Sequence, residues 1–274
     1  MSVLAPDIPD SIDSRFAGLV DAVKSGWFLN DSDEYFRGFP ICADDVVLDV
    51  GCGEGAASLF SAKRAAKVIY SDIVPEVVAE VTAKLESSGS DAEFQPLVCD
   101  SDPLLLPDAC ATRIICSEVL EHVDDPQKVM AELVRVGKPD ALYLLTVPGE
   151  KGEQIQKKYA PKEYFCKPNH VRIFSKDSFT GLVENSGLHI ETYSETGFFW
   201  VMWMSMFWAV EGASGRPCEE EALHRKIEPP FDDILNRWAS LWVKFISTPE
   251  GLAFKHEMDK VLPKNQVLIA RKPV

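Results

Sequence analysis

Short hydrophobic runs alternate with helix-compatible segments through the middle of the chain. The first four runs end at or just before Gly, Ser or Cys, and the fifth ends just before Pro148. Strands that alternate with helices are typical of a parallel sheet with helices on both faces. The predicted strands of this region are residues 46–50, 67–70, 94–99, 111–116 and 142–147.

The C-terminal part of the chain predicts two more strands with a helical segment between them. A helix over 179–186 ends at Gly187 and leads into a strand at 188–193, and 266–271 is the closing strand. The segment between them begins with Phe198 to Val210, in which Ser205 is the only polar side chain. A membrane span needs about 20 residues. This run therefore predicts a buried helix, an apolar wall or lid of a substrate pocket, an interfacial helix or a dimer contact.

Two other segments show apolar residues at helical spacing. A helix over 232–246 places its apolar residues on one face, which predicts packing against the helix of 198–210. The segment 15–38 predicts an N-terminal helix that lies over the sheet. Its apolar positions are Phe16, Leu19, Val20, Val23, Trp27 and Phe28.

The stretch VVLDVGCGEG, residues 46–55, combines a strand with a glycine-rich turn. Glycine permits positive φ and a close approach of the backbone N–H groups to a polar ligand. Gly51, Gly53 and Ala56 also match the pattern of dinucleotide-binding folds, and Asp72 suits a ribose in either interpretation. The turn alone therefore predicts a ligand site without fixing the ligand.

The composition limits the classes of molecule that the protein is expected to bind. The net charge of −15 argues against nucleic acid and against unaided adsorption to anionic lipid. The one basic cluster, within 151–172, is interpreted as a solvated face. Seven cysteines, with no C-x-x-C pair, fit reduced thiols and predict a cytoplasmic protein. The first 14 residues show neither the basic nor the apolar region of a signal peptide.

Three features together resemble the class I S-adenosylmethionine-dependent methyltransferases. They are the acid before the first glycine, the Cys99-Asp100 pair after the third strand, and SEVLEHVDDP at 117–126 after the fourth. The match is to the small-molecule branch, which includes the ubiquinone-biosynthesis O-methyltransferases, over roughly residues 40–195 and the last strand. It implies a Rossmann-like, seven-stranded α/β sheet with an antiparallel last strand and a helical insertion between the last two strands.

The resemblance also implies a domain organisation. The expected parts are an N-terminal helical lid at 1–38, a cofactor-binding α/β core at 39–196, a Trp- and Met-rich insertion at 197–263 and the final strand at 264–274. Within the lid, Tyr35 and Arg37 are candidates for the methionine carboxylate, because arginine offers a bidentate fork. The insertion is where substrate identity or oligomer contact is expected, with a homo-oligomer through 198–210 as one possibility.

S-adenosylmethionine is the cofactor that the resemblance implies. Asp49 would accept from its ammonium group, Asp72 from two ribose hydroxyls and Asp100 from the adenine amino group. A carboxylate suits these places because, when ionised, it only accepts hydrogen bonds and offers two oxygens. Ile73 would lie against the adenine, and the Ser101 N–H would meet a ring nitrogen. The predicted cofactor set is Asp49, Gly51, Gly53, Gly55, Asp72, Ile73, Asp100, Ser101, Ser117 and Glu118.

Transfer to a hydroxyl group also needs a base, and histidine suits this role near neutral pH. His122 follows the fourth strand, and His170 matches a family position at the mouth of the active site, so both are candidates. Glu118, Glu121 and His122 would share one face of a helix. With His170 they could hold a divalent metal; the alternative is that they only line the start of a helix.

The predicted function is methyl transfer to a small-molecule acceptor, on oxygen rather than on nitrogen or carbon, with an apolar or ring-containing acceptor. Membrane contact is possible but not favoured. One alternative is a nicotinamide-dependent oxidoreductase. Another is a non-catalytic scaffold of the same fold, although Asp49, the glycines, Asp72 and Asp100 are all present. A nucleic-acid enzyme is disfavoured by charge, and Ser117 to Leu120 stands where such enzymes carry an N-P-P-Y motif.

Overall fold

The computed structural model describes residues 8–213 and 229–274, which form two compact units. The α/β unit consists of Trp27–Val147, Phe174–Ser194 and Val267–Val274. The helical unit consists of the described parts of Met1–Gly26, Pro148–Ile173 and Glu195–Gln266. Each unit has its own hydrophobic core and is described by itself.

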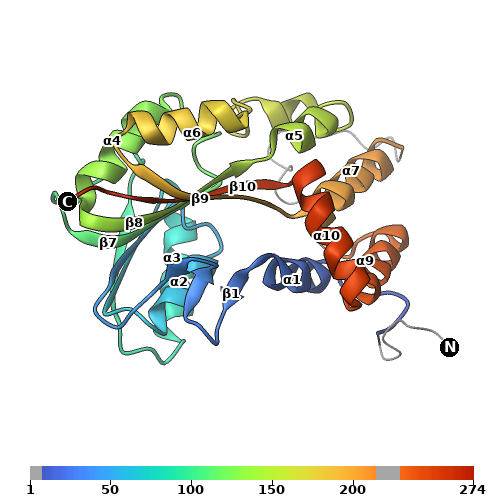
Figure 1. Ribbon diagram of the computed structural model, residues 1–274, viewed down its shortest axis with the longest axis horizontal. Coiled ribbons are helices and arrows are strands. Elements are labelled where there is room, and N and C mark those ends of the chain that lie inside the picture. Colours follow the sequence, from blue (N-terminus) through green and yellow to red (C-terminus); the bar gives the residue numbers. More distant parts are fainter. Residues whose placement is uncertain (1–7, 214–228) are drawn as a thin grey trace. The chain divides into compact units, whose positions relative to one another are not determined.

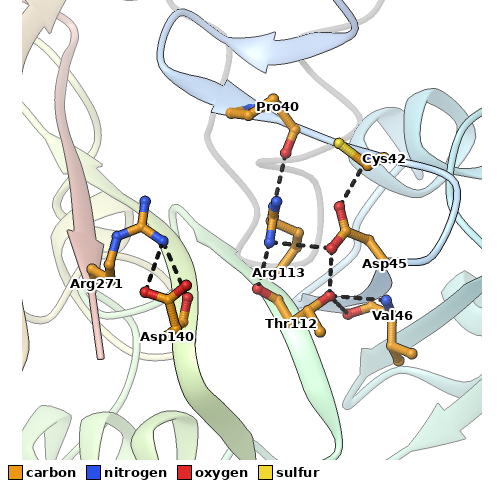
Figure 2. Close-up of polar contacts among 8 residues, drawn as sticks. All are labelled: Pro40, Cys42, Asp45, Val46, Thr112, Arg113, Asp140 and Arg271. Carbon is orange, nitrogen blue, oxygen red and sulfur yellow. Dashed lines mark hydrogen bonds and ion pairs between the residues drawn. The ribbon is translucent and has the colours of Figure 1, made fainter. Parts of the chain in front are cut away.

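A seven-stranded mixed sheet, in the order β6-β5-β4-β7-β8-β10-β9, is the centre of the α/β unit. Strands β6, β5, β4, β7 and β8 pair in parallel, and the β10-β9 end is antiparallel. At that end Arg271 on β10 pairs with Asp140 on β8 (Figure 2). The strands are β4 (Val46–Val50), β5 (Lys67–Asp72), β6 (Glu93–Val98), β7 (Ala111–Ser117), β8 (Gly137–Pro148), β9 (His189–Thr196) and β10 (Asn265–Arg271). The predicted fold class is confirmed.

Helices cover both faces of this sheet. In Figure 1, α4 (Pro126–Val136) and α6 (Lys176–Asn185) lie on one face, and α2 (Ala56–Ala62) and α3 (Pro75–Glu86) on the other. Successive strand residues point to opposite faces. Two cores result: Leu48, Ile114 and Leu145 belong to the first, and Val47, Ile115 and Leu144 to the second. Burial on both faces explains why the strands are continuous hydrophobic runs.

The amino-terminal edge of the sheet is closed by a polar network (Figure 2). The hydroxyl of Thr112 donates to Asp45 Oδ1 over 2.8 Å and accepts from the Val46 N–H over 3.0 Å. The guanidinium of Arg113 lies 3.1 Å from Asp45 Oδ1 and donates to the Pro40 carbonyl over 2.8 Å. These bonds tie the starts of β4 and β7 together. The opposite, carboxyl-terminal edge carries the candidate site.

The predicted long N-terminal helix is shorter than expected. Helix α1 (Ser14–Ser25) ends at Gly26, which takes the left-handed conformation with φ of 106°. The aromatic residues that follow extend the hydrophobic pattern but form strands. They build a three-stranded sheet of β1 (Trp27–Leu29), β2 (Glu34–Phe36) and β3 (Phe39–Pro40). A glycine at this place stops a helix because it adopts positive φ without steric cost.

Helix α1 also buries the opposite face from the one that its pattern predicts. Phe16 is 55% exposed and Leu19 51%, whereas Ala17 and Asp21 are buried in the helical unit. A Cβ on Gly18 would lie 2.0 Å from the ring of Trp200, so α1 packs closely against that ring through small residues. The apolar residues of this helix therefore do not form its packed side. The face of α1 that carries small residues is packed instead, because small residues allow a close approach.

Aromatic residues dominate the core of the helical unit. The predicted helix at 198–210 is α7 (Phe198–Ala213), and the one at 232–246 is α9 (Asp233–Ile246). The rings of Phe198 and Trp242 lie 5.4 Å apart, which confirms that α7 packs on α9. The segment at 198–210 is thus a buried core helix. The unit also contains α5 (Glu150–Gln156), the short 3-10 helix η1 (Lys162–Phe165) and α10 (Pro249–Val261), which the pattern did not predict.

A buried charged network joins the helices of this unit. Lys255 on α10 is 0% exposed, and its Nζ lies 2.6 Å from Asp259 Oδ2 and 3.3 Å from Asp21 Oδ1. Trp242 Nε1 donates to Asp21 over 2.8 Å, and the Phe198 N–H donates to Asp259 over 2.9 Å. Burial raises the pKa of Asp21 to about 6, although Lys255 opposes this shift. Within 8–213 and 229–274, no helix has the length and apolar character needed to cross a membrane.

Candidate active site

Four neighbouring parallel strands end at the same edge of the α/β unit. β6, β5, β4 and β7 are adjacent, and each pair runs parallel. Ligands of open α/β sheets bind outside the carboxyl ends of such strands. The predicted acids lie there: Asp49 within β4, Asp72 at the end of β5, and Asp100 after β6. Topology therefore brings together residues that are far apart in the sequence.

The glycine turn after β4 adopts a backbone that other residues rarely take. Gly51, Gly53 and Gly55 have φ of +68°, +48° and +84°. A Cβ at Gly51 would lie 2.4 Å from a methyl group of Val119, so this glycine permits a close packing contact. A Cβ at Gly53 would meet nothing within 4 Å. Space is therefore open beside Gly53, where the prediction places the cofactor.

Asp49 is buried with one strong hydrogen bond. It is 3% exposed, and its Oδ2 accepts from the hydroxyl of Ser58 on α2 over 2.6 Å. Burial raises the pKa of this carboxyl to about 6, and the Ser58 bond acts in the opposite direction. A buried carboxylate gains most from a cation that replaces its lost hydration. The ammonium group of an amino-acid ligand fits this requirement.

Asp72 is held by backbone groups on both of its oxygens. Oδ2 accepts from the Gly53 N–H over 3.3 Å, and Oδ1 from the Val74 N–H over 3.0 Å. Each carboxylate oxygen accepts more than one hydrogen bond, so capacity remains for two hydroxyls. The neighbouring Ile73 is 65% exposed, and such a side chain suits contact with a flat aromatic group. These two residues fit the ribose and adenine of the predicted cofactor.

The Asp100 and Ser101 pair differs in detail from the prediction. The Ser101 N–H donates to Asp100 Oδ1 over 2.6 Å, and the Ser101 hydroxyl lies 3.3 Å from the same oxygen. To contact adenine as predicted, the Ser101 N–H would have to give up its hydrogen bond to Asp100 Oδ1. Asp100 Oδ2 carries none of these bonds. The assignment of this pair to adenine stays a prediction.

Glu118 stands at the end of β7 in an unusual conformation. Its φ is +55°, its N–H donates to the Thr146 carbonyl over 3.1 Å, and its Oε1 accepts from the Thr146 hydroxyl over 3.1 Å. Non-glycine residues in this region cluster at functional sites. The preceding Ser117 has a buried hydroxyl without a partner among the described residues. Both residues were predicted to face the reacting end of the cofactor.

The predicted helical face of Glu118, Glu121 and His122 does not form. Residues 118–125 are turns and bends, and α4 begins only at Pro126, with Asp125 as its N-cap. The left-handed backbone of Glu118 is incompatible with a helix at this place. Glu121 is 0% exposed, and His122 Nε2 lies 3.8 Å from its Oε1. The expectation of one helix face for the metal hypothesis is therefore wrong.

The other predicted residues fall into both units. Tyr35 on β2 is buried against the rings of Trp27, Phe28 and Phe60, and burial raises the pKa of its hydroxyl, with Asp49 adding to the shift. Arg37 lies exposed between β2 and β3. His170 belongs to the helical unit, where its ring contacts Glu153.

The residues that hold the predicted site residues in place lie on elements that sequence spacing does not relate to the site. Ser58 holds Asp49 from the following helix, and Thr146 holds Glu118 from β8. Glu153 contacts His170 from α5. Isolated Ser, Thr and Glu residues are too common to be selected from one sequence, so no sequence signal indicated these three.

Comparison with known proteins agrees with this geometry. Residues 48–145 match a family model described as a methyltransferase domain. The chain is 29% identical over 175 residues to a probable S-adenosylmethionine-dependent methyltransferase of Mycolicibacterium smegmatis, an alignment that covers 62% of each chain. It is 28% identical over 155 residues to a ubiquinone biosynthesis O-methyltransferase of Xanthomonas axonopodis pv. citri, covering 54% of this chain and 64% of that one. The chain thus spans less than two thirds of the length of these relatives.

A solved structure supports the fold. An S-adenosylmethionine-dependent methyltransferase from Mesorhizobium loti aligns with a TM-score of 0.54 at 16% identity, over 86% of this chain and 94% of that chain. At this identity the likeness concerns the fold alone. Together with the family match, it confirms the resemblance. Residues 48–145 therefore match the methyltransferase domain that the resemblance to class I S-adenosylmethionine-dependent methyltransferases implied.

Proposed function

We propose that the protein transfers a methyl group from S-adenosylmethionine to a hydroxyl group of a small, apolar or ring-containing molecule. The observation that carries this proposal is the row of acids at the carboxyl ends of β4, β5 and β6, beside an open glycine turn. Asp49 binds the ammonium group, Asp72 the ribose and Asp100 the adenine. Ser117 and Glu118 lie toward the reacting end.

When bound, S-adenosylmethionine supplies a methyl group on a positively charged sulfur, which is already activated for transfer. The chain then has to align the acceptor, exclude water and remove the hydroxyl proton. His122 and His170 are the candidate bases. Oxygen is the favoured acceptor atom, and nitrogen or carbon is the alternative. The relation to ubiquinone biosynthesis O-methyltransferases supports a ring hydroxyl.

The helical unit is proposed to select the acceptor. Its helix α7 also carries aromatic side chains that are only partly buried, Phe198 and Trp200. Such residues suit a flat apolar molecule because they offer large contact area at low entropic cost. The same helix could instead serve a homo-oligomer contact. A molecule with one aromatic ring and neighbouring hydroxyls is therefore the first acceptor to test.

No metal is part of this proposal. The helix face predicted for Glu118, Glu121 and His122 does not form, but Glu121, His122 and His170 remain a group that could hold a metal ion. The proposal assigns removal of the hydroxyl proton to a histidine instead, so methyl transfer should continue at the full rate after exhaustive treatment with a chelator. Loss of activity that added Mg²⁺ or Zn²⁺ restores would contradict this and would assign a divalent ion to Glu121 and its neighbours.

The first test is calorimetric titration of the full chain with S-adenosylmethionine and S-adenosylhomocysteine. Binding of both, followed by transfer of labelled methyl to catechol or a related ring hydroxyl, is the expected result. Binding without transfer to any oxygen, nitrogen or carbon acceptor would favour a non-catalytic scaffold. Absence of binding to both ligands would contradict the proposal.

A further inference from the structure

We infer that Glu153 is a positioning residue that holds the His170 ring with its proton on Nδ1. In this tautomer Nε2 carries the lone pair that takes the proton from the acceptor hydroxyl. The inference rests on the proposed function, because it takes His170, one of the two candidate bases, as the base. Its local geometry lies entirely within the helical unit.

The contact between the two side chains is short and buried. Oε2 of Glu153 lies 2.7 Å from Nδ1 of His170. The Glu153 side chain is 2% exposed and the His170 side chain 10%. An ionised carboxylate only accepts hydrogen bonds, so the nitrogen that faces it carries the proton. In the neutral ring the other nitrogen, Nε2, is then the acceptor.

The loop around His170 fixes the position of the ring. The His170 N–H donates to the Tyr164 carbonyl over 3.2 Å, and the centroids of the two rings lie 4.8 Å apart. Asn169 donates to the Glu163 carbonyl over 3.1 Å and to the Cys166 carbonyl over 2.8 Å. The loop is thus held by backbone N–H groups and by the side-chain amide of Asn169. A ring held in this way needs little reorganisation during a reaction.

A contribution to stability does not explain why α5 buries polar side chains. Glu153 Oε1 is buried without a partner among the described residues, and so are both amide atoms of Gln156, one turn further along the helix. Each such group destabilises the folded state, because it loses its hydrogen bonds to water and gains no partner. An apolar side chain at position 153 would avoid this cost. The carboxylate is therefore better explained by its action on His170 than by packing.

A base that is oriented by a third group follows the general pattern of activated hydroxyl chemistry. For His170, Glu153 is that third group.

The proton and electron balance of the step is complete. The acceptor O–H bond breaks, and Nε2 of His170 takes the proton. The oxygen uses the released electron pair to bond the methyl carbon, and the carbon–sulfur bond breaks with its electrons left on sulfur. Glu153 then faces an imidazolium and stabilises its positive charge, as a charge-assisted hydrogen bond does.

The direct test is the tautomer of His170 in the full chain. Long-range ¹H–¹⁵N correlation spectra, recorded at a pH where the ring is neutral, distinguish the two tautomers, and His170→Gln assigns the signals. We expect the Nδ1–H form in the native chain and its loss in Glu153→Met, which keeps side-chain length without an acceptor. Glu153→Gln should retain the form, because its carbonyl accepts from Nδ1. Glu150→Met on the same helix is the matched control.

The second test measures turnover and stability. With catechol as the acceptor, Glu153→Met should lower kcat by roughly 10²-fold, the usual contribution of a general base. KM for catechol and affinity for S-adenosylmethionine should change less than twofold. Glu153→Met combined with His170→Gln should be no slower than His170→Gln alone, because residues that act as a unit are not additive. The melting temperature of Glu153→Met should be unchanged or higher.

The outcomes separate this inference from the proposed function. A native His170 in the Nε2–H form, or an unchanged tautomer in Glu153→Met, would overturn the positioning role. A further loss in the double variant would give Glu153 a role of its own. If the native chain fails to bind S-adenosylmethionine, the proposed function fails, whereas the spectra still decide the positioning role because they need no turnover.

Discussion

The two units of this protein bury polar groups for different reasons. In the α/β unit, Asp49 is a buried acid beside a glycine turn and accepts a hydrogen bond from Ser58. In the helical unit, Asp21, Lys255, Asp259 and Trp242 form a closed network that links α1, α9 and α10. An incompletely compensated acid is typical of a ligand site, whereas a closed network serves structure. Substitutions in each unit should therefore have opposite consequences for stability.

The largest effect is expected from Lys255→Met. Removal of the cation leaves two buried carboxylates without their shared partner, which should lower the free energy of unfolding by about 3–5 kcal/mol. Urea unfolding followed by tryptophan fluorescence would measure it. Lys260→Met on the same helix is the control: Lys260 is 63% exposed and pairs with Glu257, so its loss should change little. Equal effects of the two variants would mean that the buried network is not the structural element described above.

Asp49→Asn should raise the free energy of unfolding, whereas Lys255→Met lowers it. The pKa of Asp49 is raised from 3.8 to about 6, so the folded state holds this proton more tightly than the unfolded chain. That contribution to stability is complete below the unfolded pKa and is lost as the pH rises through about 6. Without cofactor, the variant should be more stable than the native chain by the order of 2–3 kcal/mol at pH 7, and about equal near pH 4.

The pH dependence of the stability difference between Asp49→Asn and the native chain tests this explanation. Urea midpoints of both proteins at pH 4 and pH 7 would measure the difference, and Ser58→Ala should widen it by removing the bond that lowers the pKa of Asp49. The stabilised Asp49→Asn variant should at the same time bind S-adenosylmethionine more weakly. A loss of stability at pH 7 would show that Asp49 is structural, like the acids of the helical unit.

Asp72→Ala should weaken cofactor binding with little change in stability. One charge-assisted hydrogen-bonded site is worth about 1.5–3 kcal/mol, which corresponds to tenfold or more in affinity. Calorimetric titration with S-adenosylmethionine would measure the loss. Asp91→Ala, an exposed acid before β6, is the matched control and should bind as the native chain does. Unchanged affinity in Asp72→Ala would place the ribose elsewhere.

The smallest effect is expected from Leu19→Lys on α1. Leu19 is 51% exposed, so the free energy of unfolding should change by no more than about 0.5 kcal/mol. If the apolar side of α1 were the core side, the same change would cost several kcal/mol, as loss of a buried leucine does. Ala17→Lys, at a position that is 0% exposed, should be strongly destabilising and tests the packed face directly.

Sequence patterns predicted the α/β unit well because its strands are buried on both faces. Continuous apolar runs such as 46–50 and 111–116 have no other simple interpretation between helices, and the parallel topology then places Asp49, Asp72 and Asp100 at one edge. The same method failed for α1. Its packed face consists of Ala17, Gly18 and Asp21, which periodicity cannot identify as a core.

The conformation of the turn after β7 could not be predicted from the spacing of residues, for a different reason. Glu118, Glu121 and His122 have helical spacing, but the left-handed backbone of Glu118 interrupts any helix before Pro126. Thr146, 28 residues further along the chain, holds Glu118 in place. A single sequence contains no sign of such a partner, because the contact depends on how β7 and β8 pair.

The sequence by itself determined the parallel sheet, the glycine turn and the row of acids, since these depend on local hydrophobic runs and on the rule that parallel strands end at one edge. Only the tertiary structure decided which face of α1 is buried, how Lys255 is compensated and which carboxylate faces His170. Those features depend on side chains that meet from distant segments. Their energies arise from burial and exact pairing, which no local pattern encodes.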